Sequence, residues 1–192
     1  LVMSEGDRDF YWLDNLATII AKSPVTVIIK EGGFGMSPHA FKQLKQLEPA
    51  AINVGGANGT NFAMIERRRN RNNTSFNLDS YGLSTVESLL SATFTKNTHP
   101  LIATGGISSA NDIVTSLMLG ANMTSSAGFL LETLMAGRQS ALIELIHQWQ
   151  SDLPRLFTLL GAKNITDLQH KERLYSNELQ NFISQQQKNA NL

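Results

Sequence analysis

The stretch Leu101 to Ser109, Leu-Ile-Ala-Thr-Gly-Gly-Ile-Ser-Ser, joins an apolar run, a glycine pair and a helix-start signal. It predicts a buried strand, a sharp turn at Gly105 and Gly106, and a helix that opens with a capping box between Ser109 and Asp112. The free N–H groups of such a turn, beside the positive end of a helix, form an anion site. An isolated Gly-Gly pair also serves as an ordinary turn, so recurrence of the pattern decides between the two interpretations.

Three other apolar runs end in the same way. The runs and the small residues that follow them are Val25 to Lys30 before Glu31-Gly32-Gly33, Ala50 to Val54 before Gly55-Gly56, and Met123 to Ser125 before Ala127-Gly128. Their β-branched and apolar content favours strands, and we expect the first to be buried on both faces. In α/β folds the carboxyl ends of parallel strands carry the chemistry.

Helical patterns alternate with these strands. We expect helices over Asp9 to Lys22, His39 to Leu47, Ser84 to about Phe94, Ser109 to near Gly120, Leu130 to Met135, and Ser140 to Leu160, the last kinked at Pro154. Asn164 should cap a final turn, and residues 183–192 form a polar tail that we expect to fray. Four βα units predict a parallel sheet with right-handed crossovers.

Four such units are half of a (β/α)8 barrel, which needs about 250 residues. We therefore predict the α/β class and a single partial barrel domain over residues 1–192. Because the chain opens on Leu1 without an initiator methionine, we expect a fragment. Its unpaired sheet edges would be closed by a missing N-terminal half or by a partner.

The composition narrows the class of protein. With 16 basic and 16 acidic residues and a pI near 7.1, the chain lacks the basic excess of nucleic-acid and membrane-surface binders. No apolar run is long enough to cross a membrane. The absence of cysteine excludes disulfides, cysteine-ligated zinc, iron–sulfur clusters and thiol catalysis. We expect a cytoplasmic location.

Several residues at the strand ends are candidates for ligand binding. Lys30 ends a buried strand on the ligand side, where it either stabilises negative charge on a ligand or pairs with Glu31. The Gly55 to Thr60 segment is either a second ligand-binding turn or the start of a flexible loop. The run from Glu66 to Arg71 is either a solvated loop or a cationic lid over a diphosphate.

Three motifs together resemble one known family. They are Ile-Ile-Lys-Glu-Gly-Gly-Phe-Gly-Met-Ser at 28–37, Ile-Asn-Val-Gly-Gly-Ala-Asn-Gly-Thr-Asn-Phe-Ala at 52–63, and Ala-Thr-Gly-Gly-Ile at 103–107. This set, with Ala127-Gly128 and Met3 to Arg8, resembles the C-terminal half of type 2 isopentenyl-diphosphate Δ-isomerases. The resemblance implies an FMN-dependent barrel that converts isopentenyl diphosphate to dimethylallyl diphosphate with Mg²⁺ and reduced flavin, and NADPH serving only as the reductant.

The resemblance also implies residue roles. Lys30 would contact the N1/O2 edge of the isoalloxazine ring and Thr60 would bind FMN. The FMN phosphate would be held by residues of two turns, Gly105, Gly106, Ile107 and Ser108 in one and Ala127 and Gly128 in the other. The family commonly has Arg where this chain has Ser108, and Trp-Gly where it has Tyr81-Gly82.

The family's remaining machinery is expected outside this sequence. The glutamine that assists proton transfer and the glutamate that holds Mg²⁺ lie on the strand just before the segment of Met3, so we assign no catalytic residue and no metal ligand to this chain. The isolated chain should then have little activity. The family also implies a homo-oligomer.

Two alternatives stay open. One is another FMN-dependent barrel, such as a 2-hydroxy-acid oxidase, although such enzymes need a His-Gly-Gly-Arg strand end and this chain has Val54 there with no histidine near it. The other is a non-catalytic FMN-binding half-barrel.

Overall fold

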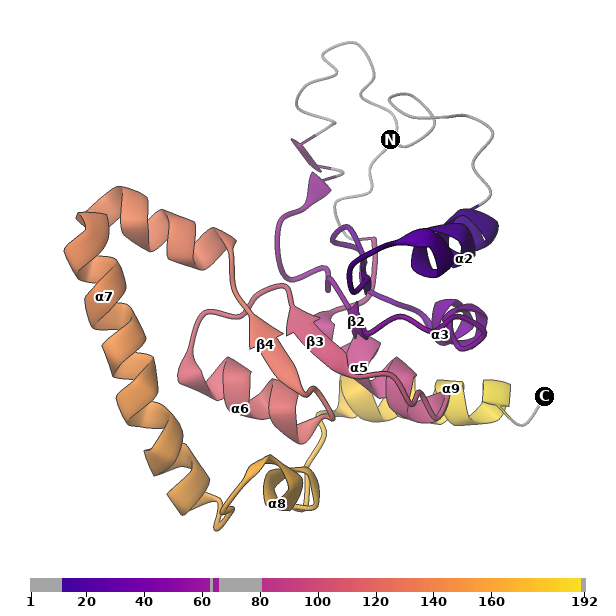
Figure 1. Cartoon of the computed structure of the whole chain (residues 1–192). Helices are drawn as coiled ribbons and strands as arrows, with labels where there is room; N and C mark the ends of the chain where they lie inside the picture. The colour runs from indigo at the N-terminus through magenta and orange to yellow at the C-terminus, as the bar shows by residue number, and fades with distance from the viewer. Residues whose placement is uncertain (1–11, 63, 66–80, 191–192) are drawn as a thin grey trace.

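Four parallel strands form a single sheet in the computed structural model, which describes residues 12–62, 64–65 and 81–190 (Figure 1). The strands are β1 (Ile28–Lys30), β2 (Ala51–Asn53), β3 (Leu101–Thr104) and β4 (Met123–Ser125). Their order in the sheet is β1-β2-β3-β4, so each strand pairs with its neighbour in the sequence. Ile29 lies opposite Ile52, and Ile102 lies opposite Met123. The predicted parallel sheet of four strands is confirmed.

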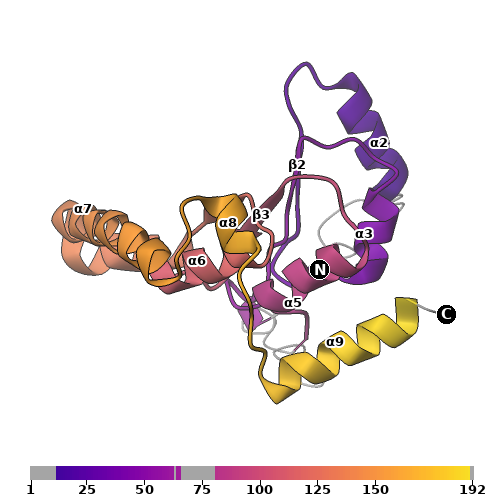
Figure 2. The ribbon, with the colours of Figure 1, turned by 90° about the horizontal axis from the view of Figure 1, so that it is seen from below.

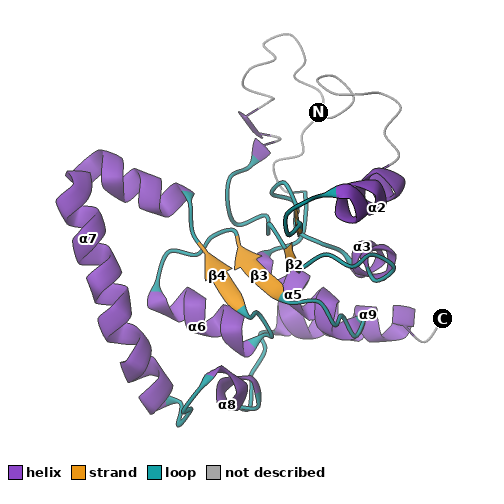
Figure 3. Ribbon diagram, in the orientation of Figure 1, coloured by secondary structure: helices purple, strands orange, loops and turns teal. Residues whose placement is uncertain are grey.

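Helices connect the strands and follow the last one (Figure 3). Those of the described residues are α2 (Trp12–Lys22), α3 (Pro38–Leu44), α5 (Thr85–Phe94), α6 (Ala110–Met118), α7 (Gly128–Leu159), α8 (Ile165–Gln169) and α9 (Asn177–Ala190). Serine caps begin three of them, because the side chains of Ser37, Ser84 and Ser109 each accept an N–H from the first turn.

One face of the sheet packs against helices and forms the core. Ile52 and Ala103 are fully buried, and they share a cluster with Phe41 of α3 and Leu89 of α5. Helix α9 lies beside α5 (Figure 2), and its apolar residues pack against the same cluster. A second cluster joins α6 to α8 and to the C-terminal part of α7.

The opposite face of the sheet is exposed at its two outer strands, which corrects the expectation that the first strand is buried on both sides. Ile28 is 52% exposed and Met123 is 60% exposed, whereas Ala51 and Asn53 on the inner strand β2 are 8% exposed. Among the described residues, neither β1 nor β4 has a partner strand on its outer edge. Half a barrel has this form, because the strands that would pair with its two edges and enclose its inner face belong to the other half.

Helix α7 is broken at Arg138, where φ is +58° and ψ is −165°. Two arms at an angle result (Figure 1). The predicted boundary near Gly137 is therefore correct, whereas the predicted kink at Pro154 is wrong, because α7 has its non-helical torsion angles at Arg138 alone. A proline far along a helix loses one N–H bond, and the rest of this arm tolerates that loss.

The C-terminal stretch is helical as far as Ala190, in α9. The fraying expected for residues 183–192 stays a prediction, and residues 191–192 lie outside the described part. Within the described residues, no helix is long and apolar enough to cross a membrane.

Candidate functional site

A cavity of about 790 Å³ lies where the carboxyl ends of the four strands meet. Parallel strands bring these ends to one edge of the sheet, so turns far apart in sequence become neighbours. All the candidate ligand-binding residues of the sequence analysis line this one cavity: Lys30, Thr60, Gly105, Gly106, Ile107, Ser108, Ala127 and Gly128. The structure therefore brings together what the sequence predicts.

The Gly105–Gly106 turn requires glycine at both positions. Gly105 has φ of +108° and Gly106 has φ of +74°, in the region that favours glycine. A Cβ on Gly105 would lie 2.2 Å from the carbonyl oxygen of Gly56, and a Cβ on Gly106 would lie 2.6 Å from the Cβ of Asn58. The turns that follow β2 and β3 thus pack backbone to backbone.

Backbone donors of two turns are open to a ligand. Within the described residues, the N–H groups of Gly106 and Ile107 donate to no other group. Helix α7 begins at Gly128 with Ala127 as its N-cap, and no side chain caps it. Its first N–H groups therefore lack an intrahelical partner. Ser126 Oγ donates to the carbonyl oxygen of Ile107 at 2.6 Å and so joins the two turns.

Ser108 lies at the cavity, but its donors are already engaged. Its N–H and its Oγ each lie 3.0 Å from Oδ2 of Asp112, and Ser109 Oγ donates to the same oxygen at 2.8 Å. Burial acts to raise the pKa of Asp112, but the hydrogen bonds from Ser108 and Ser109 outweigh it and hold this pKa below its ordinary value. Ser108 therefore serves mainly to hold the first turn of α6 through Asp112.

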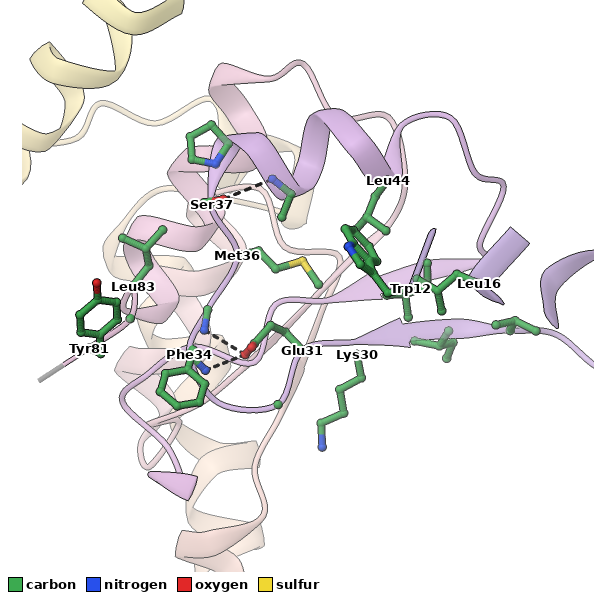
Figure 4. Close-up of a pocket in the computed structure, with 18 of the residues that line it drawn as sticks. Trp12, Leu16, Lys30, Glu31, Phe34, Met36, Ser37, Leu44, Tyr81 and Leu83 are labelled. Atoms are coloured by element: carbon green, nitrogen blue, oxygen red, sulfur yellow. Dashed lines mark hydrogen bonds between the residues drawn. The ribbon is translucent and has the colours of Figure 1, made fainter. Parts of the chain in front are cut away.

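Lys30 is exposed at the cavity instead of buried, and it forms no ion pair within the described residues. The alternative of a salt bridge to Glu31 is not seen. Glu31 Oε2 instead accepts the N–H groups of the turn that follows it, at 2.6 Å from Gly33, 2.7 Å from Phe34 and 2.9 Å from Gly35. Figure 4 shows Lys30 on the opposite side of β1 from Trp12, with its ammonium group free.

A second cavity, of about 910 Å³, lies on the other side of the Glu31 turn (Figure 4). Its lining is mainly apolar, and Trp12, Leu16, Phe34 and Met36 contribute to it. Lys30 is the only one of the sequence-predicted candidates that reaches it. The candidate site is therefore the first cavity.

Sequence reasoning missed several residues that shape the site. Thr85 and Ser126 bond to the turns, and Thr104 Oγ1 at the cavity wall is buried with no hydrogen-bond partner among the described residues. Asn58, within the predicted Gly55 to Thr60 segment, accepts the N–H of Thr85. Ser126 directly precedes Ala127-Gly128, so its place in the sequence could have indicated a role at this turn.

The run from Glu66 to Arg71 lies outside the described residues. Among the described residues, no cluster of His, Asp and Glu is suited to hold a metal ion.

Comparison with known proteins identifies the family. Residues 4–175 match the model of the FMN-dependent dehydrogenases. This chain belongs to the FMN-dependent dehydrogenase family. Among the curated relatives of this chain, the isopentenyl-diphosphate delta-isomerase of Lactococcus lactis is 52% identical over 185 residues. These residues are 96% of this chain and 53% of the relative. The isopentenyl-diphosphate delta-isomerase of Staphylococcus aureus strain JH9 is 38% identical over 98% of this chain and 54% of its own.

Comparison with solved structures shows the fold to which this chain belongs. A lactate oxidase from Pediococcus acidilactici superposes with a TM-score of 0.63 at 14% identity, covering 91% of this chain and 44% of the oxidase. A mandelate oxidase superposes with a TM-score of 0.61, covering 85% and 44%. The chain spans about half the length of the curated relatives it matches. The predicted half of a (β/α)8 barrel is confirmed.

The cavity fits the phosphate of FMN. A Cβ on Gly128 would meet no atom within 4 Å, so space remains directly at the uncapped start of α7. The N–H groups of Gly106 and Ile107, which have no partner among the described residues, supply neutral donors that suit a phosphate. The volume also lies within the usual range of about 300–1,000 Å³ for cofactor sites.

Proposed function

We propose that this chain provides the FMN-binding half of an isomerase that interconverts isopentenyl diphosphate and dimethylallyl diphosphate in isoprenoid biosynthesis. The observation that carries the proposal is the convergence of all eight candidate residues on one cavity. The sequence supports the isomerase over an oxidase, since the chain is 52% identical to the L. lactis isomerase and only 14% identical to the superposed oxidases.

In this proposal the two backbone turns hold the FMN phosphate. The N–H groups of Gly106 and Ile107 donate from one side, and the first N–H groups of α7, from Gly128 on, donate from the other. The rigidity of the Gly105 turn keeps these donors in place before the ligand arrives, which lowers the cost of binding.

Lys30 and Thr60 line the part of the cavity at the ends of β1 and β2. With FMN bound, the Lys30 ammonium would contact the N1/O2 edge of the ring and stabilise negative charge on it, and Thr60 would supply a hydroxyl. Reduced FMN, when bound, supplies the acid–base chemistry that moves a proton on and off the alkene.

The rest of the machinery is proposed to come from outside this sequence. The assisting glutamine and the glutamate that holds Mg²⁺ belong, by the resemblance, to the half of the relatives that this chain does not match. NADPH serves as the reductant of the flavin. We also propose a cytoplasmic, homo-oligomeric enzyme.

The test is FMN binding followed by complementation. The purified chain is titrated with FMN and assayed for isomerisation with FMN, Mg²⁺ and NADPH, alone and with the N-terminal half of the L. lactis relative. We expect FMN binding by the chain and turnover only with both halves. Lys30→Met should slow turnover, whereas Lys42→Met, at an exposed lysine of α3, should not.

The other outcomes would favour one of the alternatives or overturn the proposal. FMN binding without turnover of the combined halves would favour a non-catalytic half-barrel. Oxidation of a 2-hydroxy acid would favour the oxidoreductase alternative. A chain that binds no FMN, alone or with the other half, would overturn the proposal.

A further inference from the structure

The two glycine turns of the cavity meet at the hydroxyl of Thr85. Thr85 begins α5 and is 5% exposed. Its Oγ1 lies 2.6 Å from the carbonyl oxygen of Gly105 and 3.1 Å from that of Thr104. Since a hydroxyl has one proton to donate, the shorter contact to Gly105 is the principal bond.

This bond fixes the direction of a backbone donor. The carbonyl of Gly105 and the N–H of Gly106 belong to one peptide unit, which is planar and trans. In such a unit the two groups point in opposite directions. With its carbonyl held by the buried Thr85, the peptide must direct the Gly106 N–H away from Thr85, on the side where Gly106 lines the cavity.

Asn58 completes the arrangement from the neighbouring turn. Its Oδ1 accepts the N–H of Thr85 at 3.0 Å, and its Cβ lies 2.6 Å from where a Gly106 Cβ would stand. Gly56 leaves room for Thr85, because a Cβ there would lie 2.2 Å from Oγ1. The three segments thus interlock around one hydroxyl.

We propose that Thr85, held by Asn58, is a positioning residue that aims the Gly106 N–H at the phosphate of the bound cofactor. Thr85 does not line the cavity, so it acts through the Gly105–Gly106 peptide. This inference rests on the proposed function, because it names what determines the affinity of the same site for a phosphate.

The test compares variants that differ in one hydroxyl. Thr85→Val keeps the shape and removes the donor, and Thr85→Ser restores it. Thr93→Val is the matched control, because Thr93 Oγ1 bonds only the carbonyl of Leu89 at the far end of the same helix. For each variant, dissociation constants for FMN and for riboflavin, which lacks the phosphate, are measured on the full chain. The ¹H–¹⁵N chemical shift of the Gly106 amide is measured by NMR without ligand.

We expect Thr85→Val to weaken FMN binding about 10- to 100-fold, the range for a lost buried hydrogen bond, with riboflavin binding unchanged within about 2-fold. The Gly106 amide resonance should shift, because the Gly105–Gly106 peptide loses the hydrogen bond at its carbonyl. Thr85→Ser and Thr93→Val should behave as the unaltered chain. If Thr85→Val fails to fold, Thr85→Ala, which removes the same donor and leaves a smaller side chain, takes its place.

Equal weakening of FMN and riboflavin, or an unchanged Gly106 amide resonance, would overturn the inference and leave the proposed function standing. Failure of Thr85→Ser to restore FMN affinity would overturn it as well. An unaltered chain that binds no FMN would remove the proposed function and, with it, the role of Thr85 in phosphate binding.

Discussion

Phe129 stacks on Trp149 across the bend of α7, with ring centroids 6.2 Å apart and an interplanar angle of 10°. Phe129 lies in the first turn of α7 and lines the candidate cavity, whereas Trp149 lies beyond the break at Arg138. The stack thus joins the wall of the cavity to the distal arm of the helix.

This contact makes Trp149 an internal reporter of ligand binding. A ligand that occupies the cavity beside Phe129 should change the emission of Trp149, since indole fluorescence depends on its immediate surroundings. We expect titration with FMN to quench tryptophan emission, and Trp149→Phe to abolish most of the change. Trp12→Phe, which alters the second cavity, should retain it. A full response in Trp149→Phe would contradict the prediction.

Gly105→Ala should cost far more than Gly120→Ala. Both glycines have positive φ, +108° and +102°, so both substitutions strain the backbone by about 1–2 kcal/mol. Only at Gly105 does the new Cβ also meet backbone, at 2.2 Å from the Gly56 oxygen. We expect Gly105→Ala to lower the free energy of unfolding by about 3 kcal/mol or more. Urea denaturation measures both, and equal costs would rule out the backbone clash as the cause.

Asp112 should make stability depend on acid pH. Its pKa is held below the ordinary 3.8 in the folded chain, so it stabilises the fold at pH values above 3.8. As the pH falls from about 5 through the folded pKa, the unfolded chain takes up the proton first and this stabilisation disappears. We expect the difference in unfolding free energy between the unaltered chain and Asp112→Asn to be constant near pH 7 and to vanish in strong acid. A difference in unfolding free energy that grows toward low pH would contradict the prediction.

Glu31→Ala should destabilise the turn between β1 and α3. The substitution leaves the N–H groups of Gly33 and Phe34 without an acceptor, whereas the Gly35 N–H keeps the carbonyl oxygen of Gly55 at 3.1 Å. Water can replace part of the lost hydrogen bonding at this half-buried position. We expect a loss of about 1–3 kcal/mol in unfolding free energy. Glu31→Gln, which keeps one acceptor, should cost less. Glu48→Ala, at an exposed residue, serves as the control, and the same loss there would remove the assigned role of Glu31.

Local signals in the sequence predicted the elements that short-range physics determines. The strand at Met123 to Ser125 has the predicted bounds, and the helix predicted from Ser84 begins with Ser84 as its cap. The predicted capping box at Ser109 forms only in part, because Asp112 accepts the N–H of Ser108 and not that of Ser109. These features need only alternation, burial and hydrogen bonds within a few residues. The convergence of the strand ends followed in turn from the parallel order.

The features that were missed depend on contacts distant in sequence. Thr85 bonds Gly105 across 20 positions, and the side chain of Ser126 reaches back 19 positions to Ile107. Neither partner can be read from a local pattern. The exposure of Ile28 was also missed, because a hydrophobic strand of half a barrel looks in sequence like a strand that is covered on both faces.

Most donors proposed to grip the phosphate are main-chain N–H groups, and this has a consequence for how the site can change. Peptide groups do not titrate between pH 5 and 9 and are not substituted when a codon changes. Replacement of the Ala127 side chain therefore leaves the donors themselves in place. A single methyl group at Gly105, by contrast, would lie 2.2 Å from the Gly56 oxygen and displace the turn that carries the Gly106 and Ile107 donors.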